Sequence, residues 1–132
     1  MRRWFSAWGP AALWCVVIFT LSAIPGSALP ELSVSGADKL VHAVVYGVLG
    51  ALSWRGARRA RPHHSAGRVV AVATLIAMLY GITDELHQAF VPHRTPDWRD
   101  GIADTVGGIA GALVCAAFVS RREAARRGPA CE

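Results

Sequence analysis

The side chains best suited to chemistry stand at the end of a long apolar stretch, in Tyr80-Gly81-Ile82-Thr83-Asp84-Glu85-Leu86-His87-Gln88-Ala89-Phe90. Two carboxylates, an imidazole and an amide can transfer protons, bind cations or hydrogen-bond a polar ligand. On a helix Tyr80, Asp84 and Gln88 recur every four residues and share one face, with the imidazole beside them. We expect Tyr80, the deepest of them, to pack against other helices and the polar residues to form a site.

Two further polar stripes have helical spacing. Asp38, His42 and Tyr46 recur every four residues, and the aspartate falls in the first turn, where a helix favours a carboxylate. A third stripe follows Arg94 along the chain and consists of aspartates on one broad helix face. The predicted ligand-binding residues are Asp38, His42, Tyr46, Asp84, Glu85, His87, Gln88, Arg94, Asp97, Asp100 and Asp104.

Four apolar stretches must position these stripes. Of the 132 residues 53% are hydrophobic and only 17% are charged, and the longer stretches approach the roughly 20 residues with which a helix crosses a bilayer. Thr95 followed by Pro96 predicts an N-cap with proline at the first position of the last helix. We predict one all-α domain over residues 1–132, an integral membrane four-helix bundle. Its helices are expected at approximately 8–24, 38–54, 69–90 and 96–119, with a basic tail at 120–132.

Small residues in the last stretch predict how the helices pack. The segment Gly107-Gly108-Ile109-Ala110-Gly111-Ala112 offers a surface almost without side chains, which lets membrane helices approach closely. Close packing there would bring the three polar stripes together.

The distribution of basic residues predicts the orientation. Eleven of the fourteen Lys and Arg residues flank the spans on one side, and Lys39, Arg94 and Arg99 flank them on the other. Since basic residues favour the cytoplasm, both termini of this multi-pass protein are predicted to be cytoplasmic. Lys39 and Arg99 are expected to anchor the outer interface. Seven of the nine acids, Glu31 among them, fall at that outer end.

A cleavable secretory signal is the alternative for the first span. Met1-Arg2-Arg3, an apolar run to Thr20 and the small residues Gly26-Ser27-Ala28 fit such a signal. Cleavage would leave three spans and place the remaining arginine-rich segments on opposite sides of the membrane. We therefore expect the first span to be retained.

Other classes of site have little support in the sequence. Cys15 and Cys115 fall inside spans and Cys131 in the tail, so no disulfide is expected. The pair His63-His64 fits a polar loop, and no zinc spacing or nucleotide-binding loop occurs. We predict no metal and no cofactor. The net charge of +5 is attributed to topology and to lipid headgroups, and we predict no nucleic-acid binding.

Three ordered motifs resemble the VanZ-like family of small bacterial membrane proteins, over a region from Thr20 to about Val114. They are Asp38-Lys39-x-x-His42-x-x-x-Tyr46, Asp84-Glu85-x-His87-Gln88-x-Phe90-Val91-Pro92-x-Arg94 and Asp97-x-x-Asp100-x-x-x-Asp104-x-x-Gly107-x-x-x-Gly111. The family more often has asparagine where this chain has Asp104. The resemblance implies the bacterial plasma (inner) membrane and the cell envelope as the setting, with antibiotic resistance, specifically to teicoplanin, as the trait of the founding member.

Three functions are compatible with these residues. The first is a binding module whose outward polar pocket recognises an envelope lipid or lipoglycopeptide, with the bilayer as its other partner. The second is an intramembrane enzyme acting on a lipid-linked substrate, with His42 or His87 as acid/base, Asp84 or Asp100 as orienting carboxylate and a divalent metal on the carboxylates. The third is a proton or ion relay. We favour binding because the sequence contains no recognisable catalytic motif.

The polar stripes could instead only hold the helices together. Interhelical hydrogen bonds commonly do so, at about 0.6 kcal/mol each. A cavity bordered by these side chains would favour a site, and side chains locked in pairs would favour the structural role.

Overall fold

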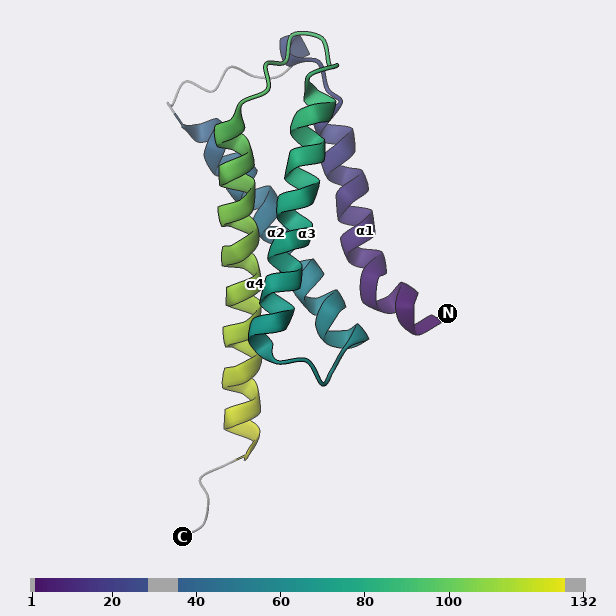
Figure 1. Cartoon of the computed structure of the whole chain (residues 1–132), viewed down its shortest axis with the longest axis vertical. Helices are drawn as coiled ribbons and strands as arrows, with labels where there is room; N and C mark the ends of the chain where they lie inside the picture. Colours follow the sequence, from purple (N-terminus) through teal and green to yellow (C-terminus); the bar gives the residue numbers. More distant parts are fainter. Residues whose placement is uncertain (1, 29–35, 128–132) are drawn as a thin grey trace.

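The computed structural model describes residues 2–28 and 36–127, and this part of the chain is all helical. The elements are α1 (Arg2–Ser22), the short 3-10 helix η1 (Gly26–Ala28), α2 (Ala37–Ala60), α3 (Ala66–Gln88) and α4 (Trp98–Arg127) (Figure 1). The four α-helices are long and apolar enough to cross a membrane, which confirms the all-α, multi-pass prediction. Glu31, Cys131 and the end of the predicted tail lie outside the described residues.

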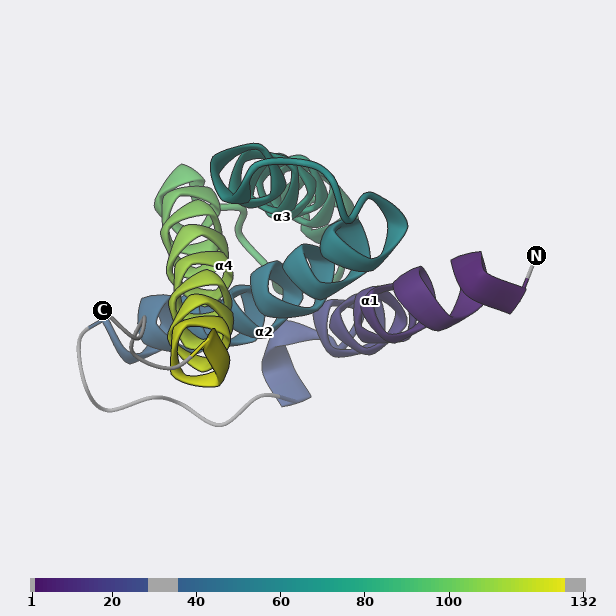
Figure 2. The ribbon, with the colours of Figure 1, turned by 90° about the horizontal axis from the view of Figure 1, so that it is seen from below.

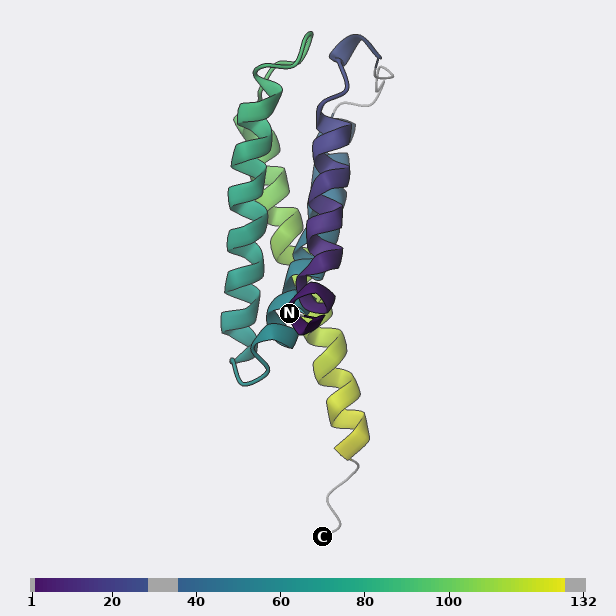
Figure 3. The same cartoon turned by 90° about the vertical axis from the view of Figure 1, so that its right-hand side faces the viewer.

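Successive helices run in opposite directions. The start of α1 and the end of α4 lie at the same end of the bundle, and η1 and the connection from α3 to α4 lie at the other (Figures 1 and 3). We call this second end, where residues 89–97 join α3 to α4, the polar end. Seen along the bundle, α2 lies between α1 and α4 (Figure 2). It contacts all three other α-helices.

The cap of α4 differs from the predicted one. Oδ1 of Asp97 accepts a hydrogen bond of 2.9 Å from the backbone N–H of Arg99, and α4 begins at Trp98. The predicted start, with Thr95 as cap and Pro96 as first helical residue, is wrong because the Asp97 carboxylate accepts from a free N–H group of the first turn. The hydrogen bond from the Arg99 N–H lowers the pKa of the Asp97 carboxyl below its ordinary value, and the ammonium group of Lys39 lowers it further by a smaller amount.

Four helix ends lie three or more residues outside the apolar stretches that predicted them, and the first is the start of α1, at Arg2 instead of near residue 8. α2 continues to Ala60 and α4 to Arg127, because arginine is a good helix former and cations are favourable in a last helical turn. α3 begins at Ala66 because the Ser65 hydroxyl accepts a hydrogen bond from the N–H of Arg68 at 3.4 Å. Hydropathy therefore located the membrane spans rather than the helix ends.

The closest helix approach is between α2 and α4, and it depends on glycine. A Cβ built on Gly107 would overlap the carbonyl group of Ala43, and one on Gly111 would overlap that of Gly47. On the other side, a Cβ on Gly50 would overlap the backbone of Gly108. The two backbones touch directly, as the small residues of the last span predicted.

α1 is attached to the bundle by hydrogen bonds as well as by packing. Trp14 Nε1 donates to the carbonyl of Val45 on α2 at 2.9 Å, and the Tyr80 hydroxyl on α3 donates to the carbonyl of Cys15 at 2.6 Å. Below these bonds Ile18 packs into a buried cluster with Leu49. Tyr80 therefore packs and bonds within the bundle instead of bordering a site.

We expect Gly111→Ala to lower the free energy of unfolding in detergent by about 1–3 kcal/mol, and with it the unfolding temperature, because the added methyl group would force α2 and α4 apart. The matched control is Gly101→Ala on the same helix, where a Cβ meets nothing within 4 Å. This control should be neutral or slightly stabilising, since alanine favours helix. Equal effects of the two substitutions on the unfolding temperature would contradict the glycine contact.

Candidate functional site

One ammonium group holds three carboxylates at the polar end. Lys39 Nζ lies 2.9 Å from Asp38 Oδ2, 3.2 Å from Asp97 Oδ2 and 2.9 Å from Asp100 Oδ1. Lys39 is expected to anchor the interface, and its partly exposed side chain also joins α2 to Asp97 and Asp100 at the start of α4. We call these four residues the lysine cluster.

A histidine–aspartate pair lies one turn deeper. His42 Nδ1 is 2.9 Å from Asp104 Oδ1, and the aspartate is completely buried, with 0% of its side chain exposed. Gly81 on α3 makes room for this carboxylate, since a Cβ there would lie 2.9 Å from Asp104 Oδ2. Asp104 Oδ2 itself has no hydrogen-bond partner among the described residues.

Glu85 completes the polar contacts between α3 and α4. Its Oε2 accepts a hydrogen bond of 3.0 Å from the backbone N–H of Asp97, whereas Oε1 is buried without a partner in the described part of the chain. His42, Glu85 and Asp100 each offer a ligand atom, and the three atoms lie within 4.8 Å of one another. These are the described residues whose geometry could hold a metal ion.

A cavity of about 340 Å³ lies on the other side of His42, among α1, α2 and α3. Its volume is within the usual range for small-ligand sites, roughly 300–1,000 Å³. Its apolar wall comes from Ile18, Leu21, Ile24, Val41 and Val45. Its polar lining comes from Ser22, Asp38, His42, Tyr46, Asp84, Gln88 and Arg94. The cavity is thus amphipathic.

Two hydroxyl groups in this cavity are buried and form no direct hydrogen bond with the described residues, and the Asp84 carboxylate lies near the hydroxyl of Tyr46. Tyr46 is 1% exposed and Ser22 is 4% exposed, and the hydroxyl oxygen of each is unpaired among the described residues. Leaving a buried hydroxyl unpaired costs about 1–3 kcal/mol. Both residues line the cavity, so a bound polar group or water can satisfy them there.

The other polar groups of the cavity are held in place by hydrogen bonds. Gln88 Nε2 donates to Asp84 Oδ2 at 3.2 Å, and both side chains are buried. Arg94 donates from Nε to the carbonyl of Ile24 at 3.2 Å and from Nη2 to that of Leu21 at 3.3 Å. Arg94 therefore caps the C-terminal end of α1 and fixes it against the segment that follows α3.

The predicted site residues fall into two groups that meet at His42. Those that line the cavity are Asp38, His42, Tyr46, Asp84, Gln88 and Arg94. Those that lie on the α4 side of His42 are Glu85, Asp97, Asp100 and Asp104. His87 belongs to neither group, because its ring stacks on Phe19 of α1 with the centroids 4.5 Å apart.

Sequence reasoning missed the contribution of α1. Ser22 and the apolar residues before it form one wall of the cavity, although the three predicted stripes all came from later helices. The available signal was a serine at the end of an apolar span, one turn after Ile18. A single hydroxyl has no periodicity, so it did not stand out.

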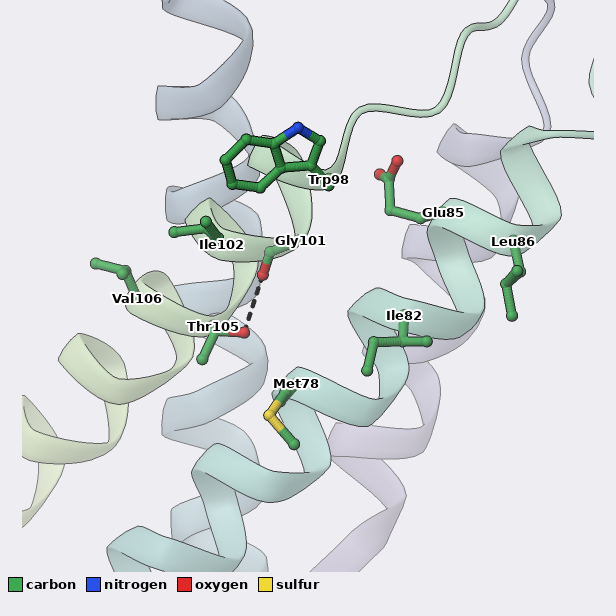
Figure 4. Close-up of a pocket in the computed structure, with 9 residues that line it drawn as sticks. All are labelled: Met78, Ile82, Glu85, Leu86, Trp98, Gly101, Ile102, Thr105 and Val106. Atoms are coloured by element: carbon green, nitrogen blue, oxygen red, sulfur yellow. Dashed lines mark hydrogen bonds between the residues drawn. The ribbon is translucent and has the colours of Figure 1, made fainter.

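A second hollow, of about 460 Å³, lies between α3 and α4 and is almost entirely apolar. Met78, Ile82, Ile102 and Val106 line it, while the Glu85 carboxylate lies toward its polar end (Figure 4). The one hydroxyl drawn there, that of Thr105, donates to the carbonyl of Gly101 at 2.9 Å. A face of this kind in a membrane span suits lipid chains, so the smaller amphipathic cavity is the candidate site.

Comparison with known proteins supports the resemblance seen in the motifs. Searches among curated proteins and among solved structures found no match to the chain. The family model described as VanZ/LLP1 matches residues 4–119, which include most of each of the four spans and every predicted site residue. The predicted family is thereby confirmed, and the chain belongs to the VanZ/LLP1 family of membrane proteins.

Proposed function

We propose that the protein is a binding module of the bacterial cell envelope whose amphipathic cavity receives the polar head of an envelope lipid or a lipoglycopeptide. The observation that carries this proposal is the pair of buried, unpaired hydroxyl groups, Tyr46 and Ser22, in a cavity with an apolar wall. A ligand with a polar head and an acyl chain meets both halves of this lining.

The position of the cavity supports a ligand from the membrane. Asp84 precedes the end of α3 at Gln88 by four residues, about 6 Å along the helix axis at 1.5 Å per residue. This depth is close to the headgroup region, where a polar head can enter while its acyl chain stays among lipids. Asp84 can accept a hydrogen bond from such a head, and the hydroxyls of Tyr46 and Ser22 can donate hydrogen bonds to it.

A purely structural role explains part of the polar set. The lysine cluster, the Asp84–Gln88 bond and the Arg94 bonds all fasten helices or helix ends together. None of these contacts involves the hydroxyls of Tyr46 and Ser22. Since an unpaired buried hydroxyl does not stabilise a bundle, these two favour binding.

In the enzymatic alternative, His42 is the better candidate for the acid/base. This imidazole borders the cavity and is oriented by a buried carboxylate, whereas His87 stacks on Phe19. If the protein is such an enzyme, we expect the purified protein to release a product from a lipid-linked precursor, and chromatography would measure this release. His42→Gln should abolish the release and His87→Gln should leave it within about twofold. Unchanged substrate with the wild-type protein would count against the enzyme.

The proposed setting includes an orientation, with both termini in the cytoplasm and the polar end outside, as the arginines predict. In a variant without native cysteines we expect Thr95→Cys to react with a membrane-impermeant maleimide on intact cells. Ala124→Cys should react only after permeabilisation. Both positions are exposed and lie at opposite ends of the bundle. The reverse labelling pattern would place the cavity at the cytoplasmic face.

Two tyrosines give a matched test of binding. Tyr46→Phe removes an unpaired hydroxyl from the cavity, and Tyr80→Phe removes one that is bonded to the Cys15 carbonyl. We expect Tyr46→Phe to weaken binding about fivefold, the value of one hydrogen bond of about 1 kcal/mol, without loss of thermal stability. Tyr80→Phe should lower the unfolding temperature and leave affinity unchanged.

The measurement is titration of the detergent-solubilised protein with teicoplanin and, separately, with a bacterial membrane lipid extract. Native mass spectrometry reports the bound species, and thermal unfolding without ligand reports stability. If neither probe binds, or if both variants bind as tightly as the wild type, the cavity does not serve as the proposed site.

A further inference from the structure

Three helices each place one potential metal ligand at the same point. His42 comes from α2, Glu85 from α3 and Asp100 from α4, with their ligand atoms within 4.8 Å of one another. Around a metal at about 2.1 Å, ligand atoms lie about 3.4 Å apart at the tetrahedral angle. The ligand atoms of the three side chains are thus at most about 1.4 Å farther apart than ligand atoms around a bound metal. Small side-chain rotations can close this difference.

Asp104 supports His42 as a metal ligand. Its fully buried carboxylate contacts His42 Nδ1 at 2.9 Å, which leaves the other ring nitrogen for a ligand. Metal-binding histidines commonly donate their second N–H to a carboxylate in this way, which fixes the tautomer and the ring orientation. Burying the Asp104 carboxylate only to orient His42 would cost free energy, because one of its oxygens has no hydrogen-bond partner in the described part of the chain.

Two carboxylate oxygens next to this point are buried without a hydrogen-bond partner. They are Glu85 Oε1 and Asp104 Oδ2, and no other carboxylate oxygen in residues 2–28 and 36–127 is in that state. One belongs to a member of the trio and the other to the residue that orients His42. A cation at the trio would compensate the negative charge of both.

The local charge balance also favours a cation. The polar end carries six described carboxylates, Asp38, Asp84, Glu85, Asp97, Asp100 and Asp104. Its basic side chains are engaged elsewhere or shared: Lys39 contacts the three aspartates of the lysine cluster, Arg94 donates to backbone carbonyls, and Arg99 lies over the Trp98 ring. Lys39 occupies only Oδ1 of Asp100, so the second oxygen of Asp100 remains for a metal.

We propose that His42, Glu85 and Asp100 bind one divalent cation of the Zn²⁺ or Mn²⁺ class, with Asp104 as the residue that positions His42. One imidazole and two carboxylates suit such first-row metals better than Ca²⁺, which takes oxygen ligands alone. This proposal differs from the sequence-based expectation of no metal. It does not rest on the proposed lipid binding, although His42 borders both the trio and the cavity.

The test is metal binding by the purified full-length protein after removal of metals with EDTA. We expect one saturable Mn²⁺ per chain by electron paramagnetic resonance, displaced by Zn²⁺. Glu85→Gln and Asp100→Asn should each weaken Mn²⁺ binding at least tenfold, and Asp104→Asn about 10- to 100-fold, as for other residues that orient a ligand. Thermal unfolding without metal identifies any variant that fails to fold.

Asp38→Asn is the matched control. It removes one negative charge from the lysine cluster but no ligand of the trio, so Mn²⁺ affinity should stay within about twofold of the wild type. An equal loss in Asp38→Asn and Glu85→Gln would show diffuse electrostatic attraction and overturn the site. Absence of saturable Mn²⁺ or Zn²⁺ binding would overturn it as well.

A measurement on the unsubstituted protein keeps the proposal testable if the variants do not fold. With ¹⁵N-labelled histidine, pulsed electron paramagnetic resonance of the bound Mn²⁺ should detect coupling to one imidazole nitrogen. Bound Mn²⁺ without nitrogen coupling would contradict the role of His42. Tyr46→Phe should bind Mn²⁺ normally, so failure of the cavity and failure of the metal site are distinguishable.

Discussion

The direct contact between the backbones of α2 and α4 is the constraint on which the rest of the structure depends. Gly107 and Gly111 lie against the carbonyl groups of Ala43 and Gly47, where any side chain would overlap the opposite helix. One turn toward the polar end from this contact, the same approach brings Asp104 within hydrogen-bond distance of His42. The glycines therefore set the packing of the bundle and, through it, the geometry of its polar residues.

Polar groups near a membrane are costly unless they are paired, and the bundle pairs most of them. Lys39 bonds to three aspartates, Gln88 to Asp84, and Arg94 to the last carbonyls of α1. Four of the exceptions at the polar end lie around His42: two hydroxyls on its cavity side, and one oxygen each of Glu85 and Asp104 on its α4 side. A fifth, Nδ1 of His87, lies apart from them. The buried polar atoms without partners, more than the number of polar residues, favour a binding site over a purely structural role.

His42 is where these two regions meet. It borders the cavity and bonds to Asp104, so a ligand on either side acts on the same imidazole. The proposed amphiphile and the proposed cation would thus be neighbours, although each rests on different atoms. Tyr46 and Ser22 carry the argument for the first, and Glu85, Asp100 and Asp104 carry it for the second.

The sequence by itself determined the four apolar helices, the multi-pass membrane character, the family and the helix faces on which the polar residues lie, because hydropathy and periodicity are local properties of a chain. Glycine in the last span also indicated close packing. Only the tertiary structure decided the partners. Lys39 bonds to Asp97 and Asp100 because the start of α4 comes opposite it, Asp97 caps α4 in place of Thr95, and His87 stacks on Phe19. The division of the polar residues at His42, and the wall that α1 adds through Ser22, depend on the rotation and depth of one helix against another. Those are properties of contacts between distant residues, and no local pattern encodes them.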